Sequence, residues 1–385
     1  MTHLTVNGRI GIERTVYWSR SAGTWTGVDR YLGIVASRVS PGARELCCRA
    51  SMGASFRQAS SNLARLGQVR MSPEQMREVS EAEGRAVKAA GRAGVLAPGW
   101  TAADCAVGPG GPTRLVVGCD GVKVPVVTAT EKQKRRRRKR RVRARRRRRK
   151  GGCRRRRRRR HPGSDGPWKE FKIAAFYDAS GEHQYAVGTA GNHEVLGRLM
   201  RREAGRLKIG EADEAISVTD GAEWIGRQLA TRLPMLDARI LDWYHLSEHV
   251  AEAAKVCFGE GSERAEGWRG KALEAVRTEG PGALLALVHR TRRRLRSRAK
   301  REALRRLEGY VAKRAEMLDY PAFLKAGFDI GSGPTEAFCK TLTSRLKGSG
   351  RRWDRPNAEA IMALASVRHS HLWETYWNTQ RPKAA

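Results

Sequence analysis

The sequence has few acidic residues: 39 Asp and Glu stand against 76 Lys and Arg in 385 residues, and the formal net charge is +37. A chain this positive favours a polyanionic partner. Nucleic acid is the commonest one, with an anionic membrane surface as the weaker alternative. The sequence also lacks a run of about 18 apolar residues and a recognisable N-terminal signal peptide. We therefore expect an intracellular protein that does not insert into a membrane.

Disulfide and zinc-binding patterns are absent as well. The chain contains seven cysteines, an odd number, and no two of them have the C-x-x-C spacing. This usage argues against a disulfide framework and against a zinc finger or ribbon, and it is typical of a reducing cytoplasm. Because hydrophobic residues still make up 40% of the chain, most of it should fold around a core, in two or three domains.

Acidic residues are missing altogether from one internal segment. Between residues 134 and 160, 22 of 27 residues are Lys or Arg, and the rest of the chain still carries +15. Self-repulsion predicts a disordered Arg-rich loop, to which we assign residues 131–166. This loop either clamps a DNA backbone, through residues such as Arg135, Arg145 and Arg154, or is a solvated run without a specific partner.

Residues 1–97 are predicted to form short strands followed by helices. Helix start signals occur at Ser40, Ser55 and Ser72. A short Gly-containing turn separates the last two helices. This arrangement favours a helix-turn-helix-like DNA-binding region, although an ordinary helical bundle explains the pattern equally well.

The second helix of a helix-turn-helix enters the DNA major groove. Glu74, Gln75 and Arg77 at its start are therefore candidates for contact with bases or phosphates. A Gly- and Pro-rich stretch, residues 98–113, follows and is predicted to be a linker to the next domain.

After the linker, strand and helix patterns alternate, which indicates an α/β domain with a mixed five-stranded sheet. The expected strands cover residues 114–127, 170–178, 183–190, 215–220 and 238–244, and the expected helices 193–207 and 222–233. We assign residues 114–258 to the first part of this domain, 259–324 to an all-helical insertion and 325–385 to its last part.

Asp120 stands out because it shares one face of its predicted strand with Val116, Val122 and Val124. A carboxylate on an apolar face is costly unless it is paired or binds a metal ion. The alternative is that the Asp-Gly dipeptide marks a turn. Asp120 is therefore a candidate metal ligand with a structural alternative.

Two further acids lie where a site could form. Asp220 follows the fourth strand, at a carboxyl end where ligands gather in α/β sheets, but it could equally cap the next helix together with Glu223. Glu336 lies in the first turn of a helix with Gly333 as the expected N-cap. The helix dipole alone already favours an acid at that place.

The helix that carries Glu336 has two distinct faces. An apolar face, expected to pack against the sheet, consists of Phe338, Leu342 and Leu346. The other face holds Glu336, followed by Lys340, Thr343 and Lys347. A carboxylate followed by cations suits a site that binds a metal ion and a phosphate backbone. The candidate DNA contacts in this region are Lys340, Lys347, Arg351 and Arg352.

Three carboxylates on different elements suit Mg²⁺, which prefers oxygen ligands. In phosphodiester chemistry two such ions, about 3.5–4 Å apart, stabilise both the attacking and the leaving oxygen. The sequence therefore predicts a metal site at Asp120, Asp220 and Glu336.

With these motifs assembled, the sequence resembles the DDE transposases of bacterial insertion sequences, and among them the ISKra family. The resemblance rests on "CDGVKVP", "VTDGAEWI" and "GSGPTEAFCK" around the three acids. It also rests on "LDWYHLSEHV", in which Asp242 and His245 fit a D-x-x-H signature. It covers residues 40–96 and 114–370.

The resemblance implies an RNase H-like catalytic domain with a helical insertion. Asp120, Asp220 and Glu336 then hold Mg²⁺, two ions in all, with Mn²⁺ as a substitute, and Asp242 and His245 lie behind these ligands. The implied reaction cleaves the terminal inverted repeats of the element, and the freed 3′-hydroxyl attacks target DNA.

The resemblance also implies a homo-oligomer on paired DNA ends, in the bacterial cytoplasm and associated with the nucleoid. Two alternatives stay open. One is an RNase H-like nuclease that cuts without joining, and the other is a catalytically inactive, basic DNA-binding relative.

Overall fold

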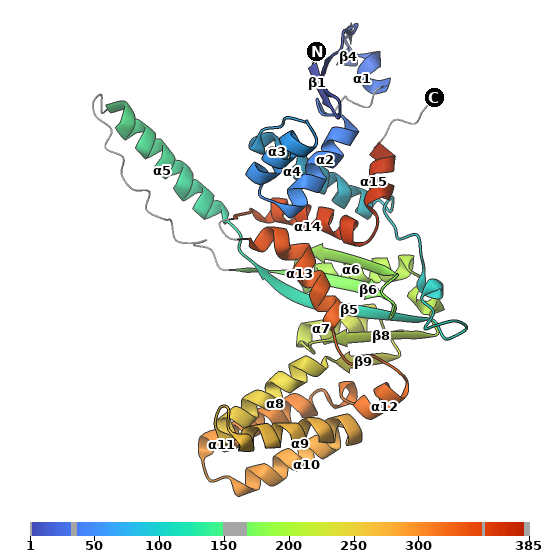
Figure 1. The fold of residues 1–385 in the computed structure, drawn as a ribbon, viewed down its shortest axis with the longest axis vertical. Helices are drawn as coiled ribbons and strands as arrows, with labels where there is room; N and C mark the ends of the chain where they lie inside the picture. The colour runs from blue at the N-terminus through green and yellow to red at the C-terminus, as the bar shows by residue number, and fades with distance from the viewer. Residues whose placement is uncertain (1, 32–36, 149–167, 349–350, 381–385) are drawn as a thin grey trace.

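The computed structural model describes residues 2–31, 37–148, 168–348 and 351–380. Three regions follow one another along the long axis (Figure 1): an N-terminal helical region, a central sheet with its covering helices, and a second group of helices at the far end. One large hydrophobic cluster extends from Val87 through the sheet to Leu304, and a smaller one surrounds Leu63 and Met76. In the described ranges, no helix combines the length and apolar character that crossing a bilayer requires.

The N-terminal region begins with two small hairpins and a short helix: β1 (Thr2–Thr5) with β2 (Gly8–Gly11), β3 (Tyr17–Ser19) with β4 (Gly23–Trp25), and α1 (Gly27–Tyr31). Three longer helices follow: α2 (Pro41–Gly53), α3 (Phe56–Leu66) and α4 (Pro73–Arg92). Their starts confirm the predicted signals. The hydroxyls of Ser40, Ser55 and Ser72 each accept a hydrogen bond from the N–H group three residues on.

Helix α4 packs along α14 (Arg355–His369), near the end of the chain. The two helices approach so closely that a Cβ on Gly84 would lie 2.2 Å from the carbonyl oxygen of Ala360, so only glycine fits there. One face of α4 is thus covered by the body of the protein. A helix-turn-helix role for α3 and α4 stays a prediction.

The segment predicted as a linker packs against the sheet region. It contains the short helix η1 (Ala102–Asp104), and both Ala102 and Cys105 are fully buried. The N–H of Ala102 donates to the carbonyl oxygen of Leu207 at 2.8 Å. The segment therefore contributes side chains to the common core.

The central sheet has five strands, as predicted: β5 (Arg114–Val124), β6 (Lys169–Tyr177), β7 (Gln184–Thr189), β8 (Glu214–Thr219) and β9 (Ala238–Leu241). Their order is β7-β6-β5-β8-β9. Strands β5, β8 and β9 run parallel, while β6 is antiparallel to both of its neighbours. The sheet is therefore mixed, with the longest strand, β5, at its centre.

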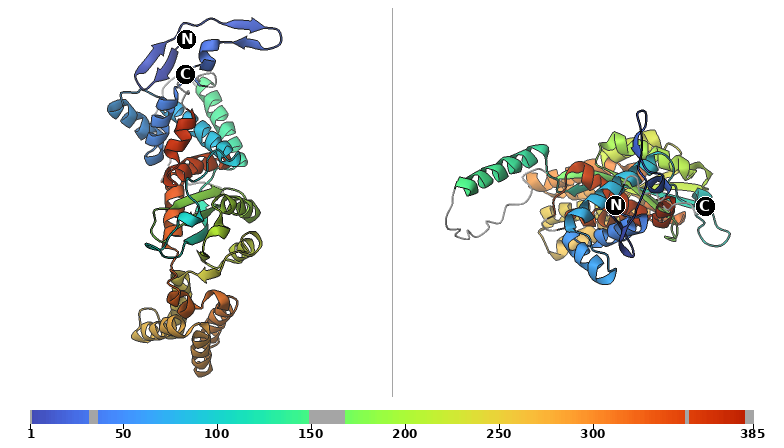
Figure 2. Two further views of the ribbon diagram at one scale, coloured as in Figure 1. Left: turned by 90° about the vertical axis from the view of Figure 1, so that its right-hand side faces the viewer. Right: turned by 90° about the horizontal axis from the view of Figure 1, so that it is seen from above.

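Helices cover both faces of the sheet (Figure 2, left). One face carries α6 (His193–Arg206) and α7 (Glu223–Arg232), and the other carries α14 and α13 (Gly333–Lys347). Gly118 on β5 faces Thr335 of α13, and Gly188 on β7 faces Met362 of α14. Both faces being buried explains why β5 reads as an almost continuous apolar run.

The far end consists of helices. Residues 259–324, assigned to the insertion, contain α9 (Glu263–Glu279), α10 (Pro281–Arg294), α11 (Arg298–Ala312) and α12 (Tyr320–Lys325), and α8 (Trp243–Phe258) precedes them. The stripe of Leu304, Leu307 and Val311 on α11 is buried. The chain then returns through α13 and α14 to the N-terminal region and ends in α15 (Trp373–Gln380).

The prediction of a disordered loop at the arginine run is wrong for its first part. Residues Ala129–Arg148 form a helix, α5, that projects from the body (Figure 1). The Thr128 hydroxyl accepts from the N–H of Glu131 at 3.1 Å and so caps the first turn. Arginine is also a good helix former, and its charge repels less strongly on exposed side chains in water than the run suggests.

The base of α5 is fastened to the segment between α13 and α14. Glu131 pairs with Arg352 at 3.0 Å, and Lys132 forms an ion pair with Asp354. The N–H of Val127 also donates to the carbonyl oxygen of Trp353 at 2.7 Å. Helix α5 is therefore an arm attached just beyond the helix that carries Glu336.

Candidate active site

The first two acids lie on neighbouring strands at the same end of the sheet. Strands β5 and β8 are parallel, and Cys119 pairs with Thr219, so Asp120 and Asp220 occupy the next position on each strand path. Asp220 accepts a hydrogen bond from the N–H of Ala222 at 2.8 Å. The N-cap of α7 is Ala222, so the alternative in which Asp220 caps this helix is wrong.

The surroundings of Asp120 disfavour the charged form of its carboxyl group. Burial raises the pKa of its carboxyl group, and the charge of Asp220 raises it further. Hydrogen bonds from Gly121 and Cys339 and the charge of His245 lower the pKa, but they do not outweigh burial. Asp120 lies within β5, so the alternative of a turn at this position is excluded. A cation between the two carboxylates would remove their repulsion.

Helix α13 crosses directly over β5 and brings the third acid towards the same region. A Cβ on Gly118 would lie 1.8 Å from the hydroxyl oxygen of Thr335, so the helix can come this close only over glycine. The Thr335 hydroxyl also lies 3.4 Å from that of Tyr177 on β6. The next residue, Glu336, is exposed in the first turn of α13.

The faces of α13 follow the sequence pattern in part. The apolar face is buried as expected, with Phe338, Leu342 and Leu346 inside. Thr343 is buried as well, although it was expected beside Glu336, and its hydroxyl donates to the carbonyl oxygen of Cys339 at 2.6 Å. The N-cap is Ser332 and not Gly333.

The three carboxylates do not meet at ligand distance. Among the described residues, Asp120, Asp220 and Glu336 do not all come within 4.8 Å of one another. Three like charges repel when no cation lies between them, and an exposed Glu336 can change its rotamer. The backbone thus brings two acids together and leaves the third on a neighbouring helix turn.

Asp242 connects the sheet to helix α13. It is fully buried and forms the N-cap of α8, where its Oδ2 accepts from the N–H of His245 at 3.0 Å. Its Oδ1 accepts from the N–H of Ser332 at 2.6 Å. Because Ser332 is the N-cap of α13, this one carboxylate fixes the start of the helix that carries Glu336. His245 is partly exposed and lies close enough for its charge to act on Asp120.

The four cations predicted near the end of α13 differ in their availability. Lys340 and Lys347 are exposed. Arg351 is partly buried and donates to the carbonyl oxygen of Arg345 at 3.1 Å, while Arg352 takes part in the ion pair at the base of α5. The two lysines are therefore the candidates with the most solvent-accessible charge.

The remaining predicted DNA contacts lie farther from the acids. Arg135 and Arg145 belong to the arm α5, and Arg154 lies outside the described residues. Arg77 forms ion pairs with Glu74 at 2.5 Å and with Glu81 at 2.6 Å, on its own helix. These pairs leave less of its charge for DNA.

Arg345 is a residue that the sequence analysis missed. It is buried on α13, its Nε donates to the carbonyl oxygen of Ser51 at 2.7 Å, and its guanidinium carbon lies 4.7 Å and 5.2 Å from the ring centroids of Phe56 and Trp353. Burial lowers the pKa of Arg345 to about 10. It joins α13 to the N-terminal helices. The available signal was its position within the apolar stripe that begins at Phe338.

A second group of potential ligands lies near the start of β5. The ligand atoms of Cys105, Asp178 and His183 all lie within 4.8 Å of one another, so they could hold a metal ion. However, Asp178 already accepts hydrogen bonds from Ser180, Gly181 and His183 in the turn between β6 and β7. The Asp178 carboxylate therefore stabilises the turn through hydrogen bonds. The set of sulfur, nitrogen and oxygen atoms also differs from the all-oxygen set expected for Mg²⁺.

Comparison with known proteins gives one distant relative. The chain is 24% identical over 142 residues to a protein described as "UPF0236 protein in vanSb 3'region" from Streptococcus gallolyticus. The match spans 37% of this chain and 30% of the relative, so the chain covers about a third of that protein's length. No protein-family model matches the chain.

Proposed function

We propose that this protein is a DDE transposase that cleaves the ends of an insertion sequence and joins them to target DNA. The observation that carries the proposal is the placement of Asp120 and Asp220 at matching positions on parallel strands, beneath the helix with Glu336. Carboxylates from adjacent strands and a crossing helix are the oxygen ligands that divalent-metal phosphodiester chemistry requires.

The topology supports an RNase H-like interpretation of the sheet. The first three strands along the domain, β5, β6 and β7, are joined as antiparallel neighbours, and β8 and β9 extend the other edge in parallel with β5. This is the arrangement that the resemblance implies. The helical insertion also enters between β9 and α13, where the resemblance expects it.

The proposal assigns a different role to each of the acidic residues and to His245. Asp120, Asp220 and Glu336 bind Mg²⁺, and the bound ions supply charge stabilisation at the attacking and leaving oxygens of the phosphodiester. Asp242 fixes the start of α13, and His245 lies beside the carboxylates. The proposal requires that the Glu336 side chain turn towards Asp120 when metal binds.

DNA is the proposed partner because the cationic surface continues beyond the acids. Lys340 and Lys347 lie exposed along α13. The arm α5, whose base is attached to the segment that follows α13, projects from the body (Figure 1). We also propose a homo-oligomer on paired DNA ends. This part rests on the resemblance alone.

A plasmid assay tests the proposal. The substrate carries the DNA that flanks the gene on both sides, and the full-length protein is added with Mg²⁺ and an unrelated target plasmid. Cleavage at the flanks followed by joined products supports the transposase. The matched control is Asp178→Asn, which removes a carboxylate from the same sheet but far from Asp120.

The two alternatives give different products in this assay. Cleavage without joined products would identify an RNase H-like nuclease. DNA binding without any cleavage, in Mg²⁺ and in Mn²⁺, would identify an inactive basic relative and refute the proposed function. If Asp120→Ala left joining intact, the assignment of this residue would be wrong.

A further inference from the structure

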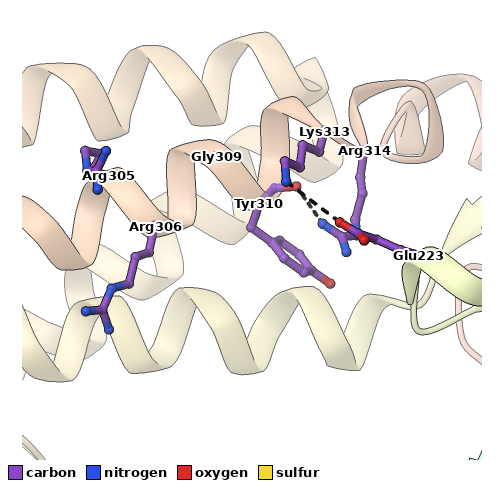
Figure 3. A pocket seen from close by; sticks show the side chains of 7 residues that line it. All are labelled: Glu223, Arg305, Arg306, Gly309, Tyr310, Lys313 and Arg314. Atoms are coloured by element: carbon purple, nitrogen blue, oxygen red, sulfur yellow. Dashed lines mark hydrogen bonds and ion pairs between the residues drawn. The ribbon is translucent and has the colours of Figure 1, made fainter.

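A groove beside Asp220 has cationic side chains at four of its seven lining residues. It has a volume of about 400 Å³ and lies between α11 and the start of α7 (Figure 3). Its lining residues are Glu223, Arg305, Arg306, Gly309, Tyr310, Lys313 and Arg314. Four cations against one carboxylate make the groove a place for an anion.

The outer cations of the groove are free enough to exchange partners. The side chains of Arg306 and Lys313 are 79% and 71% exposed. Arg306 lies 3.6 Å from Glu302, and Lys313 lies 3.8 Å from Glu223, so both ion pairs are loose and solvent-exposed. Exposed ion pairs of this kind contribute little to stability, so a phosphate group can replace them readily.

The inner end of the groove is joined to the residue that follows Asp220. Arg314 donates from its Nε to the carbonyl oxygen of Gly221 at 2.9 Å. Gly221 has a φ of +69°, and a Cβ at this position would lie 2.5 Å from Leu241 and 2.8 Å from Arg314. The groove and Asp220 are therefore held in a fixed relation by contacts that tolerate only glycine between them.

Tyr310 forms the floor between the two ends. Its ring lies under the Arg314 guanidinium, 4.1 Å from centroid to Cζ, and against the His249 ring at 3.8 Å. Its hydroxyl is buried without a hydrogen-bond partner among the described residues. In Figure 3 the ring points from α11 towards the neighbouring helix, with Arg314 and Lys313 beside it. An unpartnered O–H donor next to cations suits an anionic oxygen.

We propose that this groove binds backbone phosphates of the DNA strand that passes the carboxylates, with Arg306 and Lys313 as the outer contacts. The proposal rests on the proposed function for the identity of the strand. Arg306 lies on α11 and Lys313 is the C-cap of the same helix, seven residues on and about 10 Å away, so the groove has room for more than one phosphate. It adds a strand-holding surface on the helical insertion, separate from the arm α5.

The test measures DNA binding by fluorescence anisotropy with a labelled duplex of random sequence, in EDTA and over a salt series. The variant is Arg306→Gln with Lys313→Gln, since glutamine preserves helix propensity. The control is Lys271→Gln with Arg277→Gln, which removes the same charge from exposed positions of α9 outside the groove. A further variant, Arg306→Lys with Lys313→Arg, retains both charges.

We expect the groove variant to lower the slope of log affinity against log salt by about 1 per lost phosphate contact and to weaken binding several-fold. The control pair should change the slope by much less, and the charge-retaining pair should restore it. Inorganic phosphate at the probe's phosphate concentration should not compete, because a single phosphate lacks the second contact.

A groove variant that binds with wild-type affinity and slope, or a control pair with the same loss, would overturn the proposal. Because binding is measured without metal, this result does not depend on cleavage. A wild-type protein that binds through the groove but never cuts DNA would refute the transposase and leave the groove in place.

Discussion

Two aspartates, Asp178 in the turn after β6 and Asp120 within β5, are both removed from solvent at least in part, but the pKa values of their carboxyl groups are shifted in opposite directions. Burial raises the pKa of Asp178, yet hydrogen bonds from Ser180, His183 and Gly181 together outweigh it, and the resulting pKa lies below the usual value. Burial also raises the pKa of Asp120, and there the neighbouring Asp220 acts in the same direction, so that the pKa stays raised. The first carboxylate is satisfied within its own turn. The charged form of the second would be stabilised by a bound cation.

The opposite pKa shifts of Asp178 and Asp120 distinguish an acid with a structural role from a candidate metal ligand. Asp178, Cys105 and His183 are close enough to hold a metal ion, and proximity alone would place a site there. Asp120, Asp220 and Glu336 are less compact, and within the described ranges none of them forms an ion pair with a cationic side chain. Unneutralised charge on a rigid strand is the stronger sign of a ligand-binding position.

The largest expected effect is the loss of cleavage in Asp120→Asn or Asp220→Asn. Removing one group that stabilises charge at the reacting phosphate should lower the cleavage rate by roughly 10³-fold. Asp178→Asn should stay close to the wild-type rate. The cleavage rate is measured on the plasmid that carries the flanking DNA, with Mg²⁺. Equal losses of rate in the Asp120 and Asp178 variants would show that the two acids do not differ in function.

A smaller loss is expected from Asp242→Asn. The variant keeps the shape of the side chain but removes the charge that accepts from the N–H groups of His245 and Ser332. Because this residue acts through the position of Glu336, cleavage should fall about 10–100-fold. Mg²⁺ affinity, followed by thermal shift, should weaken at the same time. A variant that loses rate with unchanged Mg²⁺ dependence would argue for a different role.

Asp178→Asn should instead lower stability, by roughly 1–3 kcal/mol in urea unfolding. The wild-type carboxylate has a lowered pKa, so its contribution is present above the unfolded-state pKa of about 3.9 and is lost as the pH falls through the folded-state value. The stability difference between wild type and variant should therefore shrink at acid pH. A difference that is constant with pH would exclude the hydrogen-bonded carboxylate as its cause.

The smallest effect is a gain in stability for Asp120→Asn without metal. A raised folded-state pKa means that the charged form is disfavoured, so the native protein loses stability as the pH rises from about 4. The variant should melt at a slightly higher temperature at neutral pH and equally at pH 3–4. Added Mg²⁺ should stabilise the wild type alone. A variant that is less stable than the wild type at neutral pH would contradict the raised pKa.

Much of the central sheet could be predicted from local pattern. The five strands, the helices at 193–207 and 222–233 and the buried stripe on α11 follow from the alternation and spacing of apolar residues, which each segment carries within itself. The positions of Asp120 and Asp220 relative to their strands followed from the same pattern. The predicted N-cap at Gly333 missed by one residue because Ser332 and Gly333 both suit a helix start.

The contacts between distant segments could not be predicted in this way. Arg345 looked like one more surface cation, and only the approach of Phe56 and Trp353 from other elements makes it a buried one. The start of α5 is similar, since the ion pair of Glu131 with Arg352 joins residues 221 positions apart. Charge repulsion alone suggested disorder there, whereas capping, helix propensity and this anchoring favour a helix.

The sequence by itself determined which residues are candidates for chemistry in this protein: three carboxylates on a strand, after a strand and on a helix, within a chain of large positive charge. The tertiary structure alone decided which of them meet. Strand register places Asp120 beside Asp220. Gly118 allows α13, which carries Glu336, to pack closely on β5. The hydrogen bond from Arg314 to Gly221 connects the cationic groove to the same end of the strands. The reason is physical: local patterns encode secondary structure and burial, while the neutralisation of a charge depends on groups that only folding brings near.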